Sequence, residues 1–223
     1  MTDHPTPADA TSPETTDAAP TDPPPRSRAR RFLRELAVFM VLAFVLLSAR
    51  SSLADHYRVP TGSMQPTVEI DDRILVSKAA YGLRVPFTST FVTHFEGPRI
   101  GDAVVLRSPE DGKVLLKRVV AVPGSTVEVR GGHIALDGRL AEIEQRGEQL
   151  IENLAGDEHP VRLSNDGGPD FGPVTLPAGR YLVMGDNRGD SHDGRAFGLV
   201  TRDAIIGRAF AVYWRGGPVW EPL

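Results

Sequence analysis

The chain has 223 residues, which is enough for one substantial domain with some length to spare. It contains no cysteine, which excludes disulfides, thiol catalysis and cysteine-bound metals. A net charge of −4 gives no indication of nucleic-acid binding, and 22 Gly with 19 Pro favour a turn-rich β domain over a helical bundle.

The N-terminal region begins with a polar tail. Residues 1–25 are rich in Pro, Thr, Asp and Ala and have no Lys or Arg, so we expect a disordered cytoplasmic tail over residues 1–30. Five arginines follow between residues 26 and 34. An excess of arginine marks the cytoplasmic side of a membrane segment, so the chain beyond that segment is expected outside the cytoplasm.

A largely apolar run of 14 residues, 36–49, comes next and is bounded by Glu35 and Arg50. A membrane span usually needs about 20 apolar residues, so flanking residues must join the helix and charged side chains must reach back toward water. We interpret residues 31–52 as a single uncleaved transmembrane anchor. A cleaved secretory signal is the main alternative, but a small-x-small cleavage site is poorly placed. A buried soluble helix is disfavoured because the run is apolar on every face.

Residues 53–223 have the pattern of a mainly β domain. Short runs rich in Val, Ile and Leu alternate with turns rich in Gly, Pro and Asp, and Gly131-Gly132 between two such runs predicts a hairpin. Residues 139–178 are polar and are expected to form an irregular insertion. The predicted strands are 73–77, 102–107, 114–122, 125–130, 133–136, 180–184 and 204–214.

Lys117 lies within one of these apolar runs. The chain has 22 Arg and only three Lys, so a lysine at its most apolar basic position is unusual. Strand alternation puts Lys117 on the same face as Leu115 and Val119, where burial would lower the pKa of the amine toward the range of a general base. Arginine cannot be deprotonated in this way. The alternative is an edge lysine that extends to water, and Lys78 is a weaker candidate for the base.

Ser63 lies in the stretch Pro-Thr-Gly-Ser-Met-Gln-Pro-Thr, residues 60–67. Gly and Pro at this spacing predict a bend that exposes a side chain and turns backbone N–H groups toward one point, as an oxyanion requires. A plain loop serine that satisfies its own turn is the alternative. A serine hydroxyl beside a neutral amine is a nucleophile beside its base, so the pair favours a Ser/Lys hydrolase.

The loop 185–195, Gly-Asp-Asn-Arg-Gly-Asp-Ser-His-Asp-Gly-Arg, gathers acidic and basic residues. It lacks the distal glutamate of a calcium-binding loop. The adjacent Ser191, His192 and Asp193 do not make a good triad, because sequence neighbours usually point apart, although His192 stays an alternative base. We interpret the loop as one held by Asp/Arg pairs, with Asp193 and Arg195 among them.

Together these segments resemble bacterial type I signal peptidase, or leader peptidase, a family of membrane-anchored Ser/Lys serine proteases that remove signal peptides from exported proteins. The resemblance covers most of residues 31–214. It rests on the order of four blocks: 60–67, 72–76, 117–124 and 185–195.

The resemblance implies a signal-peptidase-like β-sheet catalytic domain and a role for each matching residue. Ser63 would be the nucleophile, Lys117 the general base, and Ser191 the residue that hydrogen-bonds and orients the lysine. The oxyanion would be bound by the Ser63 N–H and by the hydroxyl of Thr61, where many relatives have Ser. Asp186, Asp193, Arg195 and Arg118 would support the loop. A shallow apolar substrate pocket would be shaped by Val59, Met64, Val68 and Leu116.

The resemblance also implies location and partners. The substrates would be the signal peptides of secreted preproteins, with no metal, no cofactor and no nucleic acid involved. The chain would be a single-pass protein of the bacterial plasma membrane, in contact with the lipid bilayer, with a cytoplasmic N-terminus and an extracytoplasmic catalytic domain. Two alternatives remain: a self-cleaving Ser/Lys protease, and a non-catalytic membrane-anchored β module that binds partners.

Overall fold

The computed structural model describes residues 25–84 and 91–223. The chain divides into two compact units, residues 1–44 and 45–223. The expected disordered tail therefore lies mostly outside the described residues. The boundary between the units falls inside the segment 31–52 rather than at its end.

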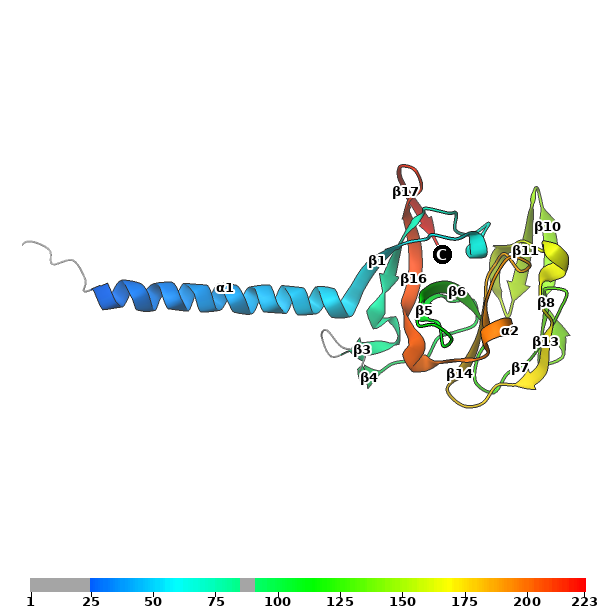
Figure 1. The fold of residues 1–223 in the computed structure, drawn as a ribbon, viewed down its shortest axis with the longest axis horizontal. Coiled ribbons are helices and arrows are strands. Elements are labelled where there is room, and N and C mark those ends of the chain that lie inside the picture. Colours follow the sequence, from blue (N-terminus) through cyan, green and yellow to red (C-terminus); the bar gives the residue numbers. More distant parts are fainter. Residues whose placement is uncertain (1–24, 85–90) are drawn as a thin grey trace, which may run out of the picture. The chain divides into compact units, whose positions relative to one another are not determined.

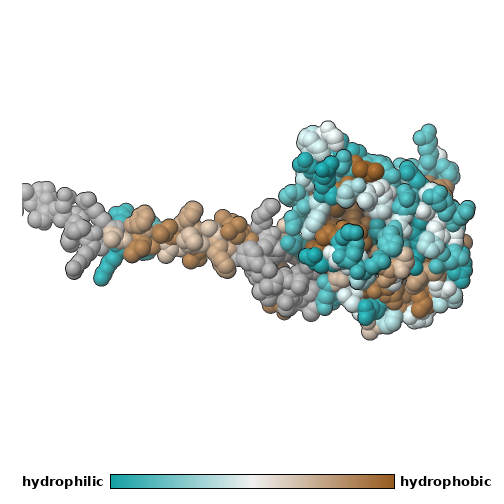
Figure 2. All heavy atoms as spheres, in the orientation of Figure 1, coloured by the Kyte–Doolittle hydropathy of each residue, from teal (hydrophilic) through white to brown (hydrophobic). Residues whose placement is uncertain are grey.

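Helix α1 (Pro25–Leu53) contains the apolar run (Figure 1). No Gly or Pro follows Pro25 in this helix, and Leu, Ala, Met and Arg are all good helix formers. Its large apolar side chains between Phe32 and Leu47 are exposed, and they colour the described part of the helix brown in Figure 2.

The predicted transmembrane anchor at residues 31–52 is not found. Within the part of the chain that the structure describes, no helix combines the length and the apolar character needed to cross a membrane. The physical reason is the short distance between Glu35 and Arg50, which leaves fewer apolar residues than the roughly 20 of a typical span.

The second unit is built on an antiparallel sheet, which confirms the predicted mainly β domain (Figure 1). The strand order is β1-β2-β16-β5-β6-β14-β15, and β17 pairs with β16. The neighbouring strands are hydrogen-bonded although many are distant in sequence, so segments far apart in the chain meet at the centre of the sheet. These strands are β1 (Ala54–Arg58), β2 (Arg73–Ser77), β5 (Ala103–Arg107), β6 (Val114–Ala121), β14 (Arg180–Met184), β15 (Val200–Thr201), β16 (Ile205–Trp214) and β17 (Pro218–Pro222).

Three smaller sheets and several short helices complete the unit. The sheets have the orders β10-β11-β12, β13-β7-β8-β9 and β3-β4. Their strands are β3 (Gly82–Arg84), β4 (Phe91–His94), β7 (Thr126–Arg130), β8 (His133–Leu136), β9 (Arg139–Leu140), β10 (Glu142–Arg146), β11 (Gln149–Leu154), β12 (Asp157–Val161) and β13 (Phe171–Thr175). The short helices are η1 (Gly62–Met64), η2 (Lys78–Tyr81), η3 (Asn165–Gly167), α2 (Gly194–Phe197) and η4 (Arg202–Ala204).

The expectation of an irregular insertion at residues 139–178 is wrong, because this segment holds strands β9 to β13. Strand β10 is mostly exposed and carries polar residues on both faces, so it lacks the apolar alternation that marks a strand. The predicted hairpin at Gly131-Gly132 is confirmed: both glycines have positive φ, and Arg130 pairs with His133 across the turn.

The core of the second unit positions the loop that follows β1. A cluster from β1, β2, β5 and β16 includes Ile74, Val105 and Val212, and Met64 and Val68 of the loop insert into it without any exposure. Each buried side chain of this size contributes about 1.5–3 kcal/mol of burial free energy. Met64 and Val68 therefore fix the loop to the sheet on either side of residues 65–67.

Candidate active site

The turn that carries Ser63 is held by its own backbone and by buried neighbours. Its ends are closed by hydrogen bonds from the Val59 N–H to the Asp72 carbonyl at 2.9 Å and from the Asp71 N–H to the Val59 carbonyl at 2.8 Å. Met64 is fully buried, whereas Ser63 is half-buried in the short helix η1. The sequence therefore places a serine at the edge of a cavity on a turn that cannot easily shift.

Lys117 contacts this serine from the neighbouring strand β6, where it pairs with Val104 of β5. Its Nζ lies 2.6 Å from Ser63 Oγ, and only 3% of the residue is exposed. Burial lowers the pKa of the amine, the carboxylates of Asp193 and Asp186 partly oppose this, and the resulting pKa is about 8. With this pKa, about a tenth of the amine is neutral at pH 7 and about half at pH 8, and this neutral form is what a general base requires.

The other two lysines have acidic partners. Lys113 pairs with Asp111 at 2.7 Å on the surface, which raises the pKa of its amine, and Lys78 lies 3.5 Å from Asp55. The preference for Lys117 over Lys78 as the residue beside the serine agrees with this geometry.

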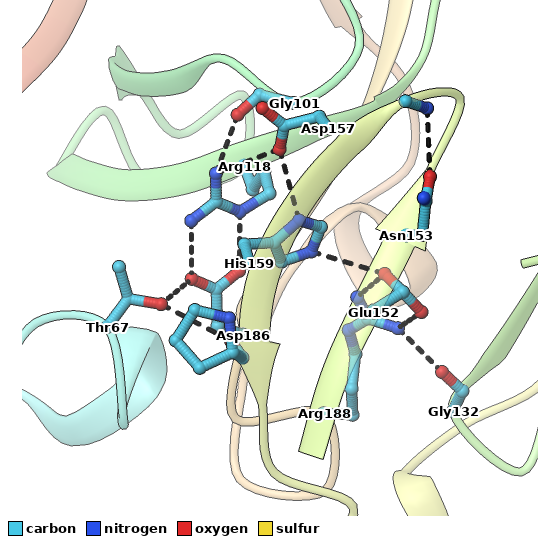
Figure 3. A network of polar contacts seen from close by, with 12 residues as sticks. Thr67, Gly101, Arg118, Gly132, Glu152, Asn153, Asp157, His159, Asp186 and Arg188 are labelled. Carbon is cyan, nitrogen blue, oxygen red and sulfur yellow. Dashed lines mark hydrogen bonds and ion pairs between the residues drawn. The ribbon is translucent and has the colours of Figure 1, made fainter. Parts of the chain in front are cut away.

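Arg118, the next residue of β6, faces the opposite side and binds Asp186 (Figure 3). Its Nε and Nη2 each donate to the Asp186 carboxylate at 2.9 Å, and Thr67 Oγ1 donates to the same group at 2.5 Å. Burial raises the pKa of the Asp186 carboxyl, but Arg118 outweighs it and holds that pKa below its ordinary value. The pair ties the loop after β14 to the strand that carries Lys117.

Asp193 and Arg195 form a second pair in the same loop, and both are buried. Arg195 Nε and Nη2 donate to the Asp193 carboxylate at 2.8 Å, and Asp193 Oδ2 accepts from the Gly185 N–H at 3.0 Å. The guanidinium also donates to the carbonyls of Gly167 and Arg188. The predicted Asp/Arg pairs are thus present, and arginine side chains occupy the carboxylates that a calcium loop would need for its ion.

Ser191 and His192 differ from expectation. Ser191 Oγ is buried without a hydrogen-bond partner among the described residues, although it is near enough to Asp193 to lower the pKa of that carboxyl. The expected hydrogen bond to Lys117 is therefore absent, and an orienting role for Ser191 stays a prediction. His192 Nε2 lies 2.7 Å from Glu110 Oε2 on the surface, where both side chains are about 60% exposed.

A cavity of about 260 Å³ opens beside Ser63 and Lys117. Its wall includes Val59, Thr61 and Leu116 of the predicted set. Met64 and Val68 were wrongly expected in that wall: both have no exposure and pack in the core below. Eight further residues line the wall and were not predicted: Tyr57, Arg58, Pro60, Ile74, Val105, Lys113, Val114 and Leu115. Strand alternation around Lys117 is the signal that would have found Leu115, whereas Tyr57, Ile74 and Val105 come from other strands that only the sheet topology brings to the cavity.

A buried polar network extends from Asp186 into the sheet β10-β11-β12 and was not predicted (Figure 3). His159 lies between Asp157, 3.1 Å from Nδ1, and Glu152, 3.2 Å from Nε2. Arg188 donates to Glu152 at 2.9 Å and 2.5 Å. Burial lowers the pKa of the His159 imidazole, but the two carboxylates outweigh it and raise that pKa above its ordinary value. With His159 protonated, the network contains three cations, which balance its three carboxylates. The cations are His159, Arg118 and Arg188, and the carboxylates are Asp157, Glu152 and Asp186.

Asn187 was also missed, although it follows Asp186 directly. It is almost fully buried, and both its backbone N–H and its side-chain amide donate to the turn that carries Ser63. Its position within a polar loop gave no sign of this contact, because the partner residues lie more than 120 positions earlier in the chain.

Comparison with known proteins gives a consistent result. The family described as signal peptidase, peptidase S26, matches residues 32–214. Signal peptidase I of Pseudomonas aeruginosa is 36% identical over 204 residues, covering 81% of this chain and 71% of that protein. Signal peptidase I of Leptolyngbya laminosa is 32% identical over 219 residues, covering 93% and 91%. Signal peptidase I P of Bacillus subtilis subsp. natto is 31% identical over 183 residues, covering 78% and 85%. The chain therefore belongs to the signal peptidase family, peptidase S26, and is a serine protease of that family.

Proposed function

We propose that this protein is an endopeptidase that cleaves signal peptides from bacterial preproteins with a Ser63/Lys117 dyad. The observation that carries the proposal is the 2.6 Å distance between Ser63 Oγ and the buried amine of Lys117. The names of the relatives support the substrate class. The shared family disfavours a non-catalytic binding module, and no observation favours self-cleavage.

The proposed reaction passes through an acyl-enzyme. Neutral Lys117 accepts the Ser63 proton while Oγ attacks the scissile carbonyl carbon. The lysine ammonium then protonates the departing amine as the carbon–nitrogen bond breaks, which releases the mature protein and leaves the signal peptide as an ester on Ser63. Lys117 next takes a proton from water, which attacks the ester, and the ammonium returns that proton to Ser63.

The negative oxygen of the tetrahedral intermediate needs preorganised donors. We assign these to the Ser63 N–H and to the hydroxyl of Thr61, which lies at the cavity wall and makes no hydrogen bond that caps η1. Removing one such donor typically lowers kcat by about 100- to 1,000-fold. Threonine retains the hydroxyl of the serine common in the family, so its branched side chain is compatible with the role.

The cavity supports a preference for small apolar residues before the cleaved bond. Its inner wall is made of Val59, Ile74, Val105 and Leu116, and it contains no buried acidic side chain among the described wall residues. A small side chain can enter such a space without leaving a polar group unpaired. We propose that the substrate binds extended beside the strand of Lys117, as a peptide adding to a sheet does.

Attachment to the bacterial plasma membrane is part of the same proposal. It is supported by the exposed apolar side chains between Leu36 and Leu47 of α1. We propose that this surface contacts lipid. The orientation, with the catalytic domain outside the cytoplasm, remains a prediction.

The dyad is tested by cleavage of a preprotein in detergent with the full chain. Ser63→Ala removes the nucleophile and Lys117→Ala removes the base, so we expect each to lower kcat by at least about 1,000-fold without changing the circular dichroism spectrum. Lys78→Ala is the matched control and should keep wild-type activity, because its amine lies 3.5 Å from Asp55 and Lys78 is not part of the cavity wall. Wild-type cleavage by either dyad variant would refute the assignment.

A further inference from the structure

Asn187, in the loop after β14, donates two hydrogen bonds to the backbone of the nucleophile turn. Its backbone N–H donates to the Ser63 carbonyl at 3.1 Å, and its Nδ2 donates to the Gly62 carbonyl at 3.2 Å. Two consecutive carbonyls of the turn thus accept hydrogen bonds from the same residue. Asn187 is 3% exposed, so water does not compete freely for either contact.

The contact with Gly62 fixes the direction of the Ser63 N–H. The Gly62 carbonyl and the Ser63 N–H belong to one planar trans peptide, and in such a unit the two groups point in opposite directions. Holding the carbonyl toward Asn187 therefore turns the N–H away from Asn187. The cavity wall includes Thr61 and Ser63 but not Asn187. The open space of the cavity therefore lies on the side of the peptide away from the Asn187 side-chain amide, which is the side toward which the Ser63 N–H is turned.

The Asn187 side chain is itself fixed from the other end. Its Oδ1 accepts a hydrogen bond from Ser164 Oγ at 3.0 Å, which leaves Nδ2 to face the Gly62 carbonyl, a group that can only accept. Its backbone is held by a bridge to Arg162: the Arg162 N–H donates to the Asp186 carbonyl at 2.9 Å, and the Arg188 N–H donates to the Arg162 carbonyl at 2.9 Å. The segment between β12 and β13 therefore supports Asn187 through both its side chain and its backbone.

Close packing prevents the turn from moving toward the loop. A Cβ placed on Gly185 would lie 2.3 Å from the Ser63 carbonyl oxygen and 2.3 Å from Ser191 Oγ. The backbone at Gly185 thus packs directly against the backbone at Ser63, without space for a methyl group between them. The Gly62 carbonyl also accepts from the Gln65 N–H at 3.1 Å within η1, so Asn187 and the turn's own backbone together set how the peptide between Gly62 and Ser63 is rotated.

We infer that Asn187 is a positioning residue that aims the Ser63 N–H at the oxyanion of the transition state. This inference rests on the proposed function, because it assigns a cause to the orientation of one proposed oxyanion donor. Asn187 does not touch the substrate in this scheme and acts only through the peptide that it holds. Its loss should therefore weaken binding of the tetrahedral state and leave binding of the ground-state peptide nearly unchanged.

The test uses the full chain with Asn187→Ala, which removes the amide, and Asn187→Asp, which keeps the shape but cannot donate to Gly62 when ionised. Asn153→Ala is the matched control, since Asn153 Oδ1 accepts from the Gly156 N–H in a distant hairpin. Three quantities are measured: kcat and KM for a preprotein, and Ki for a peptide aldehyde ending in alaninal. The aldehyde adds Ser63 Oγ to form a hemiacetal, whose oxygen occupies the oxyanion position.

We expect both Asn187 variants to lower kcat by about 100-fold with KM changed less than about threefold. The aldehyde Ki should rise by a similar factor, while the rate keeps its pH midpoint near 8, because Lys117 is untouched. A purely structural role would raise KM and change the aldehyde Ki and the substrate KM together. The inference is overturned if kcat is unchanged, or if kcat falls while the aldehyde Ki stays at the wild-type value.

Two further variants keep the result interpretable. If the Asn187 variants do not fold, Ser164→Ala removes only the outer support and should raise the aldehyde Ki several-fold, and an unchanged Ki then contradicts the inference. Ser63→Ala in the same assay tests the proposed function separately. Wild-type cleavage by Ser63→Ala would refute that function, whereas normal Asn187 variants beside an inactive Ser63→Ala would refute only the positioning role.

Discussion

Lys117 differs from the other two lysines in what surrounds its amine. Lys113 and Lys78 lie near carboxylates at ion-pair distance, whereas Lys117 is buried and its Nζ contacts a hydroxyl. Desolvation disfavours the ammonium, and the acidic residues nearby offset only part of that cost. The local structure thus supplies a neutral amine where a serine hydroxyl can give up its proton.

The pH dependence of the rate follows from that amine. Only the neutral form of Lys117 accepts a proton, so kcat/KM should rise about tenfold per pH unit below the pKa of about 8 and level off above it. Lys117→Arg should be inactive at every pH, because a guanidinium stays charged. The profile is measured with a peptide substrate between about pH 6 and 10. A rate that stays constant between about pH 6 and 9 would contradict a titrating lysine base.

The same residue shows what sequence reasoning can find. The rarity of lysine and its place in an apolar strand pointed to Lys117, because burial on a strand face follows from local alternation. Asn187 and His159 were missed, because their roles depend on partners that only the folded topology brings together. Met64 and Val68 were placed on the wrong side, because an irregular loop has no fixed period that separates the cavity side from the core side.

At the scale of elements, the loop between β14 and β15 acts as a connector. Asp186 binds Arg118 on β6, Asn187 holds the Ser63 turn, and Asp193 binds Arg195 and the Gly185 N–H. The first two contacts join the loop to β6 and to the nucleophile turn, and the third closes the loop on itself. The loop therefore positions the turn that carries Ser63 relative to strand β6, which carries Lys117.

The Asp186 contact is expected to dominate the stability of this connection. Asp186→Ala would leave the Arg118 guanidinium buried without its main partner, and breaking a buried pair in this way costs about 3–5 kcal/mol. The free energy of unfolding is measured by urea titration at neutral pH. Asp190→Ala, which changes an exposed aspartate of the same loop, is the control and should stay within about 0.5 kcal/mol of the wild type. Equal stability of the two variants would contradict the account of the loop.

At the scale of the whole second unit, two parts have different tasks. The large sheet carries Ser63's anchoring core and Lys117, while the sheet β10-β11-β12 supplies Glu152 and His159, which stabilise the far end of the polar network (Figure 3). The fold class was predictable because strand runs of the large sheet are buried and strongly apolar. The second part was not, because exposed strands such as β10 carry charged residues that resemble a loop.

The proposed mechanism depends on the protonation state of Lys117, which a titration of the lysine amines by NMR measures directly. The chain has only three lysines, so carbon-13 labelling of their side chains gives few signals, and Lys117→Arg identifies the signal of Lys117 by its loss. We predict a midpoint near pH 8 for Lys117, and a midpoint above the ordinary lysine value for Lys113, whose pKa is raised by Asp111. A Lys117 signal that titrates at or above the Lys113 signal would contradict the account.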